Sequence, residues 1–442
     1  MRVPQSQDPD SQDPDSQDPD SQDPDPQGPE SQDKAVADHY VAYPYPARDP
    51  ADEGKRLIEG SPSRLAEVEH YLFQGRLPSP FRVLVAGGGT GDGAIQLAQH
   101  MASRGVEGEV VWLDLSHASR AVAEARAGVR GLNNIRFVQG SLLEAKALVG
   151  GDFDYVDCCG VLHHLDAPEA GLAALKAVLK PAGGMGVMVY GALGRRGVYD
   201  MQEMAETLAP TDLAPEQRLA IGQRLFKDLL PSNWLRRNPF VRDHLDGGEA
   251  GFYDLLLHAR DRAYTVRDFI ALAASASMSV VSFIEPARYD PAAYLTDPKL
   301  LATISALSPQ DQAIFAERLA GNMTTHVAYL ADVAHAGEAT AQASDLQWVP
   351  VLRDPETRDA LANTARSGKL VADTMGVKLT RSLPRRAPAI LRRVDGVFAL
   401  SAILRDIQAA DAGLTEDAFL RDFQALFRGL NGLNLMWLRR AN

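Results

Sequence analysis

Residues 83–91 read Val-Leu-Val-Ala-Gly-Gly-Gly-Thr-Gly, an apolar run that leads into a glycine-rich turn. Alanine- and leucine-rich residues follow at 93–103, so this stretch predicts a buried strand, a turn and a helix. Glycines permit positive φ and a close approach of a ligand to the backbone, and the start of the helix presents unpaired N–H groups. The turn therefore predicts a nucleotide-type ligand. Gly89, Gly91 and Ala94 also fit the dinucleotide fingerprint, which leaves a dehydrogenase open.

The sequence around this turn alternates short β-branched runs with helical stretches, a pattern typical of βαβ units around a parallel sheet. We expect strands at 82–86, 109–114, 135–139, 153–158, 184–190, 277–285 and 326–330. Helices are expected near 93–103, 118–127 and 167–179. The expected fold class is therefore α/β, with a mostly parallel sheet of seven strands.

Length and composition indicate a globular protein of two or three domains, with 442 residues and an apolar share of 45%. Because no apolar run reaches about 18 residues, no membrane span is expected, and the start of the chain lacks the apolar core of a secretory signal. The only two cysteines, Cys158 and Cys159, are adjacent in the sequence, so a disulfide between them could not cross-link distant parts of the chain. A cysteine-poor chain without a signal is expected in the cytoplasm.

Charge and repeats divide the chain further. Residues 1–33 contain ten acids and one arginine, so they contribute −9 of the net charge of −13 and leave −4 for the rest. The remainder has no broad basic field, so nucleic acid is not expected as a partner. The pentapeptide Ser-Gln-Asp-Pro-Asp repeats four times from Ser6 to Asp25. Frequent prolines and the lack of apolar residues predict a disordered acidic tail over 1–33.

The other expected domains follow from where the sequence changes between helical patterns and short β-branched runs. We expect an N-terminal helical or lid segment at 34–80, a sheet domain at 81–335 and an α-rich C-terminal domain at 336–442. The sheet domain is expected to carry a helical insertion at about 195–262.

Asp114 is the second candidate ligand residue, 23 residues after Gly91 at the end of an expected strand. A carboxylate there can accept hydrogen bonds from both hydroxyls of an adenosine ribose. As an alternative it could cap the helix that follows, and NAD would use the same acid.

Two further motifs complete the pattern. Residues 153–165 read Phe-Asp-Tyr-Val-Asp-Cys-Cys-Gly-Val-Leu-His-His-Leu, and residues 179–184 read Leu-Lys-Pro-Ala-Gly-Gly. Together with the glycine turn, Asp114 and the polar turn at 139–142, they resemble class I (Rossmann-like) S-adenosylmethionine-dependent methyltransferases. The resemblance is strong over about 80–190 and looser to about 335. It implies that S-adenosyl-L-methionine is the cofactor and that the chain is a methyltransferase. An NAD-dependent oxidoreductase and a non-catalytic S-adenosylmethionine-binding module are the alternatives.

The resemblance also implies roles for individual residues. Those expected to contact the cofactor are Gly87, Gly89 and Gly91 at the methionine half, Asp114 at the ribose, Ser141 and Leu142 at the adenine, and Cys159, Gly160 and Val161 beneath the sulfonium. One position departs from the family: many members carry an acid two residues before the first glycine, where this chain has Val85. That acid usually helps to position the amino group of the cofactor, so another group must supply the lost affinity.

Catalytic and substrate residues are less sharply marked. His163 and His164 are the candidate general bases, a role needed only when the nucleophile arrives protonated. The alternative is that one of them packs under the cofactor and the other caps the helix that begins at Ala167. The candidate substrate contacts are Tyr43, Tyr45, Arg48, His258, Arg260 and Tyr264. No metal is expected. The acceptor, a protein side chain or a small molecule, and the oligomeric state are left open.

Residues 390–404 faintly resemble the winged-helix module at the end of some bacterial protein-lysine methyltransferases. The C-terminal domain is therefore expected to be winged-helix-like. Winged helices also serve as dimer or partner modules, so this feature does not fix a function.

Overall fold

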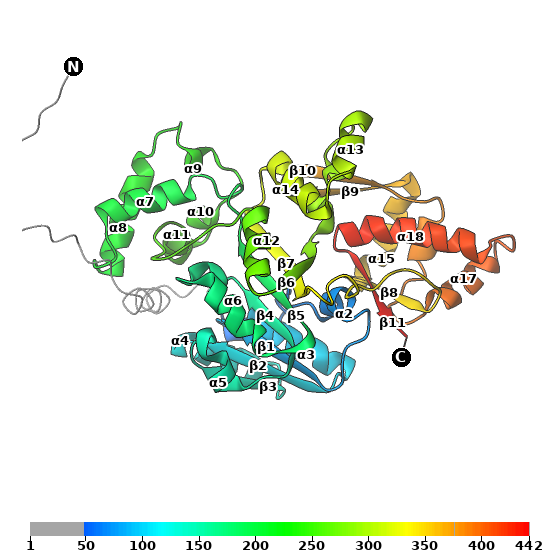
Figure 1. Ribbon diagram of the computed structural model, residues 1–442, viewed down its shortest axis with the longest axis horizontal. Helices are drawn as coiled ribbons and strands as arrows, with labels where there is room; N and C mark the ends of the chain where they lie inside the picture. The colour runs from blue at the N-terminus through cyan, green and yellow to red at the C-terminus, as the bar shows by residue number, and fades with distance from the viewer. Residues whose placement is uncertain (1–47, 375, 442) are drawn as a thin grey trace, which may run out of the picture.

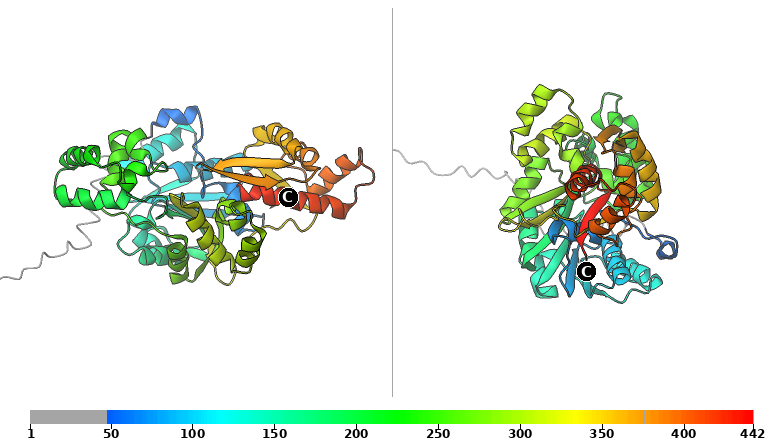
Figure 2. Two further views of the ribbon diagram at one scale, coloured as in Figure 1. Left: turned by 90° about the horizontal axis from the view of Figure 1, so that it is seen from above. Right: turned by 90° about the vertical axis from the view of Figure 1, so that its right-hand side faces the viewer.

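The computed structural model of the protein describes residues 48–374 and 376–441 (Figure 1). The expected acidic tail at 1–33 lies outside the described residues. A central sheet domain is flanked by the helical insertion at one end and by the C-terminal region at the other (Figure 1, Figure 2). No helix within the described residues is both long and apolar enough to cross a bilayer.

The sheet confirms the expected α/β class. Its strands are β1 (Phe81–Ala86), β2 (Gly108–Asp114), β3 (Ile135–Gln139), β4 (Phe153–Cys159), β5 (Leu179–Tyr190), β6 (Met278–Ile284) and β7 (Thr325–Asp332). Their order is β3-β2-β1-β4-β5-β7-β6. Only β7 runs antiparallel to its neighbours, β5 and β6. The carboxyl ends of β1, β2, β4 and β5 therefore meet at one edge of the sheet.

Alternation within the strands explains why both faces of the sheet are covered. Val83 and Val85 of β1 belong to a core that contains α2 and α3, whereas Leu84 and Ala86 belong to a core on the opposite face. Successive side chains of a strand point to opposite faces, and an apolar run without polar alternation predicts burial on both.

The helices of this domain lie before, between and after its strands. They are η1 (Pro50–Gly54), α2 (Leu65–Leu72), α3 (Asp92–Arg104), α4 (His117–Val129), η2 (Leu142–Glu144), α5 (Ala145–Val149), η3 (Leu162–His164), α6 (Pro168–Lys176), α12 (Val266–Ser275), η4 (Pro286–Tyr289), η5 (Pro291–Ala293), α13 (Pro298–Ser305) and α14 (Pro309–Ala320). Helix α12 begins with a capping box in which Thr265 and Asp268 bond to each other's backbone N–H. The aspartate fills the place that glutamate usually takes.

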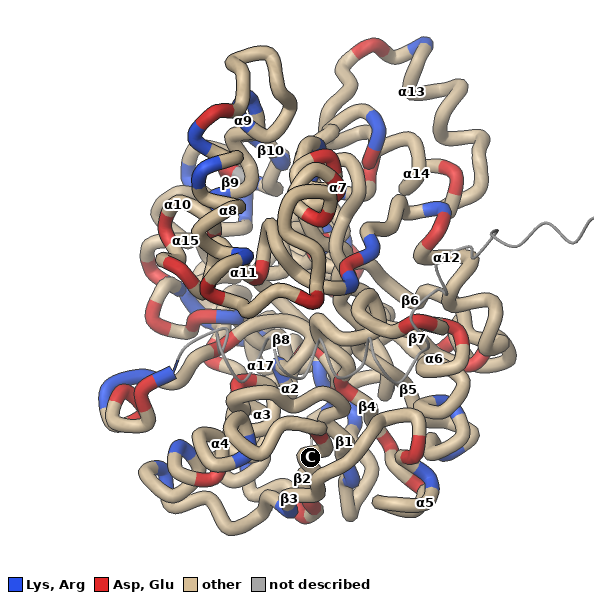
Figure 3. Tube along the Cα trace, turned by 90° about the vertical axis from the view of Figure 1, so that its left-hand side faces the viewer, with Lys and Arg blue, Asp and Glu red and all other residues tan. Residues whose placement is uncertain are grey.

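Five helices form the insertion between β5 and α12: α7 (Val198–Leu208), α8 (Pro215–Asp228), α9 (Trp234–Arg237), α10 (Asp243–Asp246) and α11 (Gly248–Leu256). They have a core of their own, with Met201, Leu235 and Phe252 among its buried residues. Basic and acidic residues are interspersed over these helices (Figure 3).

The C-terminal region combines helices with two small antiparallel sheets. Its elements are β8 (Trp348–Leu352), η6 (Pro355–Thr357), α15 (Arg358–Thr364), η7 (Ala365–Ser367), β9 (Lys369–Thr374), β10 (Val377–Ser382), α16 (Ala387–Leu391), α17 (Leu400–Gln408), α18 (Glu416–Gly432) and β11 (Met436–Arg440). Strand β9 pairs with β10, and β11 pairs with β8. The region is α-rich, as expected, and its winged-helix character stays a prediction.

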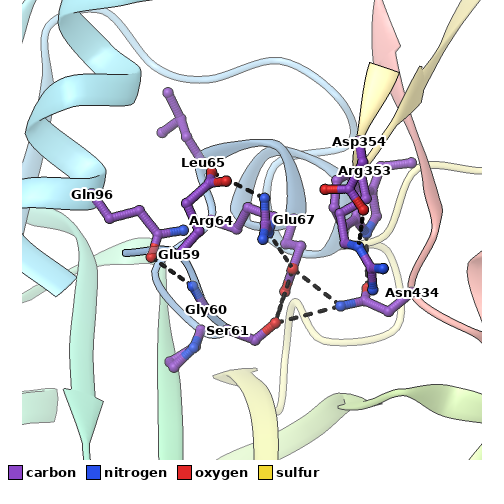
Figure 4. Close-up of polar contacts among 12 residues, drawn as sticks. Glu59, Gly60, Ser61, Arg64, Leu65, Glu67, Gln96, Arg353, Asp354 and Asn434 are labelled. Carbon is purple, nitrogen blue, oxygen red and sulfur yellow. Dashed lines mark hydrogen bonds and ion pairs between the residues drawn. The ribbon is translucent and has the colours of Figure 1, made fainter. Parts of the chain in front are cut away.

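The C-terminal region is joined to the sheet domain by a buried polar network around Glu67 of α2 (Figure 4). The Glu67 carboxylate accepts hydrogen bonds from Ser61 Oγ at 2.7 Å and from Asn434 Nδ2 at 3.1 Å. Trp437 of β11 is buried in the same core as strand β1. The final strand is therefore part of the sheet domain's packing.

Candidate cofactor and acceptor site

The glycine turn after β1 adopts the backbone geometry that its sequence predicts. Gly87, Gly89 and Gly91 have φ values of 71°, 48° and 102°, in the left-handed region that favours glycine. A Cβ on Gly87 would lie 2.2 Å from Val161 Cγ2, so this turn packs directly against the loop after β4. A Cβ on Gly89 would meet no atom of residues 48–374 or 376–441 within 4 Å. The outer side of the turn is thus open, as a ligand lying across it requires.

Asp114 lies at the end of β2 and is tied to this turn. Its carboxylate accepts a hydrogen bond from the Gly89 N–H at 2.8 Å and another from the Ser116 N–H at 2.8 Å. Helix α4 is capped by Ser116, whose hydroxyl accepts from Ser119 N, and not by Asp114. Burial raises the pKa of Asp114 in spite of these bonds. The geometry brings the predicted ribose ligand and the predicted methionine-side glycine together.

The other expected cofactor residues lie at neighbouring strand ends. Ser141 caps η2 by accepting from the Leu143 N–H at 3.2 Å. The Leu142 side chain is buried in the sheet core, so it could meet an adenine only through its backbone. Cys159 is exposed at the end of β4, and Gly160 has a φ of 79°. Their contacts with the cofactor stay predictions.

Arg48 lies beside the glycine turn, whereas Tyr43 and Tyr45 lie outside the described residues. Its guanidinium bonds both carboxylate oxygens of Asp92, the first residue of α3, at 3.0 and 2.7 Å. Arg126 bonds the same carboxylate at 2.7 Å. Burial alone would raise the pKa of Asp92, but the two arginines lower it. Arg48 therefore braces the start of α3, and a direct substrate contact stays a prediction.

His164 contacts two of the candidate substrate residues, His258 and Arg260, at the end of β4. Its Nδ1 lies 2.9 Å from the carbonyl oxygen of Arg260, 96 residues away. Its ring stacks on His258, with the ring centroids 4.1 Å apart. The backbone N–H of Tyr264 donates to the Tyr190 carbonyl at the end of β5 at 2.8 Å. The exit of the helical insertion is therefore fastened to the ends of β4 and β5.

A buried ion pair that the sequence does not predict lies in the same place. Arg195 Nη2 bonds Asp261 Oδ2 at 2.9 Å, and the two side chains are 4% and 0% exposed. The Arg195 guanidinium carbon lies 3.7 Å from the ring centroid of Tyr190. The other oxygen of Asp261, Oδ1, is buried and has no hydrogen-bond partner within the described residues.

His163 is fully buried in this cluster, and neither of its ring nitrogens has a hydrogen-bond partner in the described part of the chain. Burial, together with the nearby His164 and Arg195, lowers the pKa of His163 well below its ordinary value. Burial also lowers the pKa of His164. Both imidazoles are therefore neutral near pH 7, with nitrogen lone pairs able to accept a proton or a hydrogen bond.

Ligand atoms of His163, His164 and Asp261 all lie within 4.8 Å of one another, close enough for a metal ion. The guanidinium of Arg195 already neutralises Asp261 in this cluster. A dication would have to sit beside that positive charge, which opposes its binding. The cluster is therefore poorly suited to holding a metal ion.

Comparison with known proteins decides what kind of domain this site belongs to. Residues 83–183 match a family model described as a methyltransferase domain. Residues 83–183 thus form a methyltransferase domain. The open glycine turn with Asp114 beside it fits the adenosyl part of S-adenosyl-L-methionine, the cofactor that the sequence predicts.

Sequence relatives extend this match only in part. An uncharacterized protein of Synechococcus sp. is 31% identical over 257 residues, which cover 57% of this chain and 60% of that protein. The ubiquinone/menaquinone biosynthesis C-methyltransferase UbiE of Methylobacterium nodulans is 38% identical over 104 residues, 24% of this chain and 40% of that protein. The chain thus spans less than two thirds of either relative.

A solved structure resembles much more of the chain. PKMT2 from Rickettsia typhi aligns with a TM-score of 0.59 at 15% identity, covering 85% of this chain and 75% of that one. Its complex with AdoHcy aligns with a TM-score of 0.55 at 16% identity. At this level of identity the likeness shows a shared fold, and the coverage extends that fold beyond the methyltransferase domain.

Proposed function

We propose that this protein transfers a methyl group from S-adenosyl-L-methionine to a nucleophile held between the loop after β4 and the helical insertion. The observation that carries the proposal is the position of the cluster around His163. That residue follows two positions after Val161, which contacts the glycine turn. The loop after β4 therefore links the glycine turn to the buried polar cluster, which supports a donor and an acceptor that meet at this loop.

The methyl group supplied by the cofactor needs little help beyond a nucleophile held in line with it. Most of the rate enhancement can then come from fixed geometry and from the exclusion of water. His163 is neutral and has no partners within the described residues, so its ring can accept a hydrogen bond from a nucleophile that arrives protonated, while its lowered pKa opposes full transfer of the proton. The free oxygen of Asp261 can orient the same group.

We infer that the acceptor is a side chain of another protein. A surface hollow of about 670 Å³ on the insertion reaches His258, Arg260 and Asp261. Its wall includes the acidic residues Glu203, Glu206 and Asp212. A hollow of this size suits a peptide segment. Glu206 is paired with Arg218 of the same wall, so a basic residue of the peptide would face Glu203 and Asp212. The relationship to UbiE favours the second candidate, a small-molecule acceptor.

Transfer of a labelled methyl group tests the proposal. The protein is incubated with methyl-labelled S-adenosylmethionine and a cell lysate separated by size. Label in the high-mass fraction that protease treatment releases supports a protein acceptor, whereas label confined to the low-mass fraction contradicts it. An Asp114→Asn protein is the control for background labelling. Tight cofactor binding without label in either fraction would favour the binding-module alternative.

A further inference from the structure

The acid missing at Val85 has a substitute one strand away. Val85 of β1 is the Cα partner of Asp157 of β4 in the parallel ladder. Paired residues of adjacent strands project to the same face of the sheet. Asp157 therefore lies at the depth and on the face where an acid at position 85 would lie.

The Asp157 carboxylate lies beneath the first turn of α3, next to the glycine turn. A Cβ on Gly93, the second residue of α3, would be 3.5 Å from Asp157 Oδ2 and 2.8 Å from Ser63 Oγ. Ser63 Oγ donates to Oδ2 at 2.5 Å. The carboxylate is thus fixed from one side by the segment that precedes α2.

The second oxygen of Asp157 is buried and has no hydrogen-bond partner within the described residues. Asp157 is 1% exposed, and a buried carboxylate without a positive partner is unfavourable. Burial raises its pKa to about 7, against the lowering effect of Ser63. Such a group gains most from a ligand that brings a positively charged hydrogen-bond donor.

The neighbouring acidic and phenolic groups are already engaged. Glu67 of α2 is bonded by Ser61 and Asn434, and Asp92 of α3 is bonded by Arg48 and Arg126. The hydroxyls of Tyr155 and Tyr329 both donate to the Pro62 carbonyl, at 2.7 and 3.1 Å. Cys158 and Cys159 follow Asp157 in β4, and the Cys158 side chain lies in the core on the opposite face of the sheet. Among these groups, Asp157 has the carboxylate oxygen that is without a partner in the described part of the chain.

We propose that Asp157, held by Ser63, binds the ammonium group of the methionine part of the cofactor and so replaces the acid absent at Val85. The assignment rests on the proposed use of S-adenosylmethionine. The ligand chemistry is a primary ammonium, which forms a charge-assisted hydrogen bond with a carboxylate.

Two ligands that differ in the ammonium-bearing part separate this role from a structural one. S-adenosylhomocysteine carries the amino acid, whereas 5′-methylthioadenosine retains the adenosine and sulfur without it. By calorimetry, Asp157→Asn should weaken S-adenosylhomocysteine binding by at least tenfold and change methylthioadenosine binding by less than twofold. Equal losses for both ligands, or no loss for either, would overturn the assignment. Failure of the unchanged protein to bind either ligand would instead refute the proposed cofactor.

A charge swap guards against a folding defect. Val85→Asp combined with Asp157→Val moves the carboxylate back to β1 at the same depth. It should restore part of the S-adenosylhomocysteine affinity lost in Asp157→Val alone. A folded double variant, verified by circular dichroism, that binds no better than the single variant would count against the assignment.

The pH dependence provides a second readout. A ligand ammonium stays charged below about pH 8, so S-adenosylhomocysteine affinity should rise several-fold between pH 6.0 and 7.5 as Asp157 ionises. Asp157→Asn should flatten that rise, and methylthioadenosine affinity should show none of it. An unchanged slope in Asp157→Asn would contradict the proposal.

Discussion

The side-chain amide of Asn434, just before β11, donates a hydrogen bond to the buried carboxylate of Glu67 in α2 at 3.1 Å. The Asn434 oxygen accepts from Trp437 Nε1 at 3.0 Å. Glu67 also holds Ser61, two residues before the Ser63 that bonds Asp157 (Figure 4). The end of the chain is therefore connected to the cofactor side of the sheet through a short chain of buried polar contacts.

Removing the Asn434 amide should destabilise the protein. Asn434→Gly leaves the Trp437 indole N–H without its acceptor and removes one of several donors to the Glu67 carboxylate, at a cost of about 1–3 kcal/mol in the free energy of unfolding. Asn434 has a φ of 55°, so Asn434→Ala should cost about 1 kcal/mol more because of left-handed strain. Urea unfolding measures both. The exposed Asn133→Ala is the control, and an equal loss there would refute a specific role.

Two substitutions in the glycine turn should separate folding from binding. Gly89→Ala places its methyl group in open space and should cost only about 1 kcal/mol of stability, yet it should abolish S-adenosylhomocysteine binding because the ligand occupies that space. Gly87→Ala collides with Val161 and should lose stability as well. Thermal melts and calorimetry on the same samples report the two effects. Normal ligand binding by Gly89→Ala would show that the cofactor lies elsewhere.

The fold and the Gly89–Asp114 contact are predictable from sequence because both depend on local patterns at the ends of adjacent parallel strands. The ion pair of Arg195 with Asp261 and the bond of Ser63 to Asp157 join residues 66 and 94 positions apart. Such pairings depend on how whole elements pack, which periodicity does not encode. The sequence signal for Asp157 is a second carboxylate, after Asp154, within a strand whose other residues are apolar or aromatic.

Leu142 illustrates a second limit. Its place after β3 is visible in the sequence, but the orientation of its side chain into the sheet core is not. His258, Arg260 and Tyr264 were expected to act together, and the structure places them beside His164 and Tyr190. Their spacing from one another is local, whereas their position at the sheet depends on the five-helix insertion between β5 and α12.

The buried ion pair between Arg195 and Asp261 should behave as a unit. Arg195→Met leaves the carboxylate of Asp261 without its charged partner, and this should cost about 3–5 kcal/mol of stability. Adding Asp261→Asn removes the isolated charge and should recover much of that loss. A double-mutant cycle measured by chemical unfolding gives the coupling. Strictly additive effects would mean that the pair contributes no interaction of its own.

Acidification should destabilise the fold through His163. Its pKa is far below the ordinary 6.5 in the folded state because of burial, so between pH 7 and 5 only the unfolded chain takes up the proton. Stability should therefore fall as pH falls, by about 2 kcal/mol for this one group. Burial raises the pKa of Asp157, so its protonation stabilises the fold as pH falls. Both the unchanged protein and His163→Asn contain Asp157, and its effect therefore cancels when the two are compared.

The measurement is the slope of unfolding free energy against pH, from urea titrations at several pH values. The slope for His163→Asn should be shallower than that of the unchanged protein, by up to the amount that corresponds to one proton bound on unfolding. Parallel slopes would show that His163 titrates normally and is hydrated in the folded state.

Asp114→Asn should weaken every ligand that contains the adenosyl ribose. The carboxylate can accept from both ribose hydroxyls, and loss of charged hydrogen bonds worth about 1.5–3 kcal/mol corresponds to a 10- to 100-fold weaker affinity. S-adenosylhomocysteine and 5′-methylthioadenosine should lose affinity equally, unlike the selective loss expected for Asp157→Asn. The exposed Asp228→Asn is the charge-matched control in the same calorimetric assay. Unchanged affinity in Asp114→Asn would show that the ribose does not bind at the end of β2. The proposed orientation of the cofactor across the glycine turn would then be wrong as well.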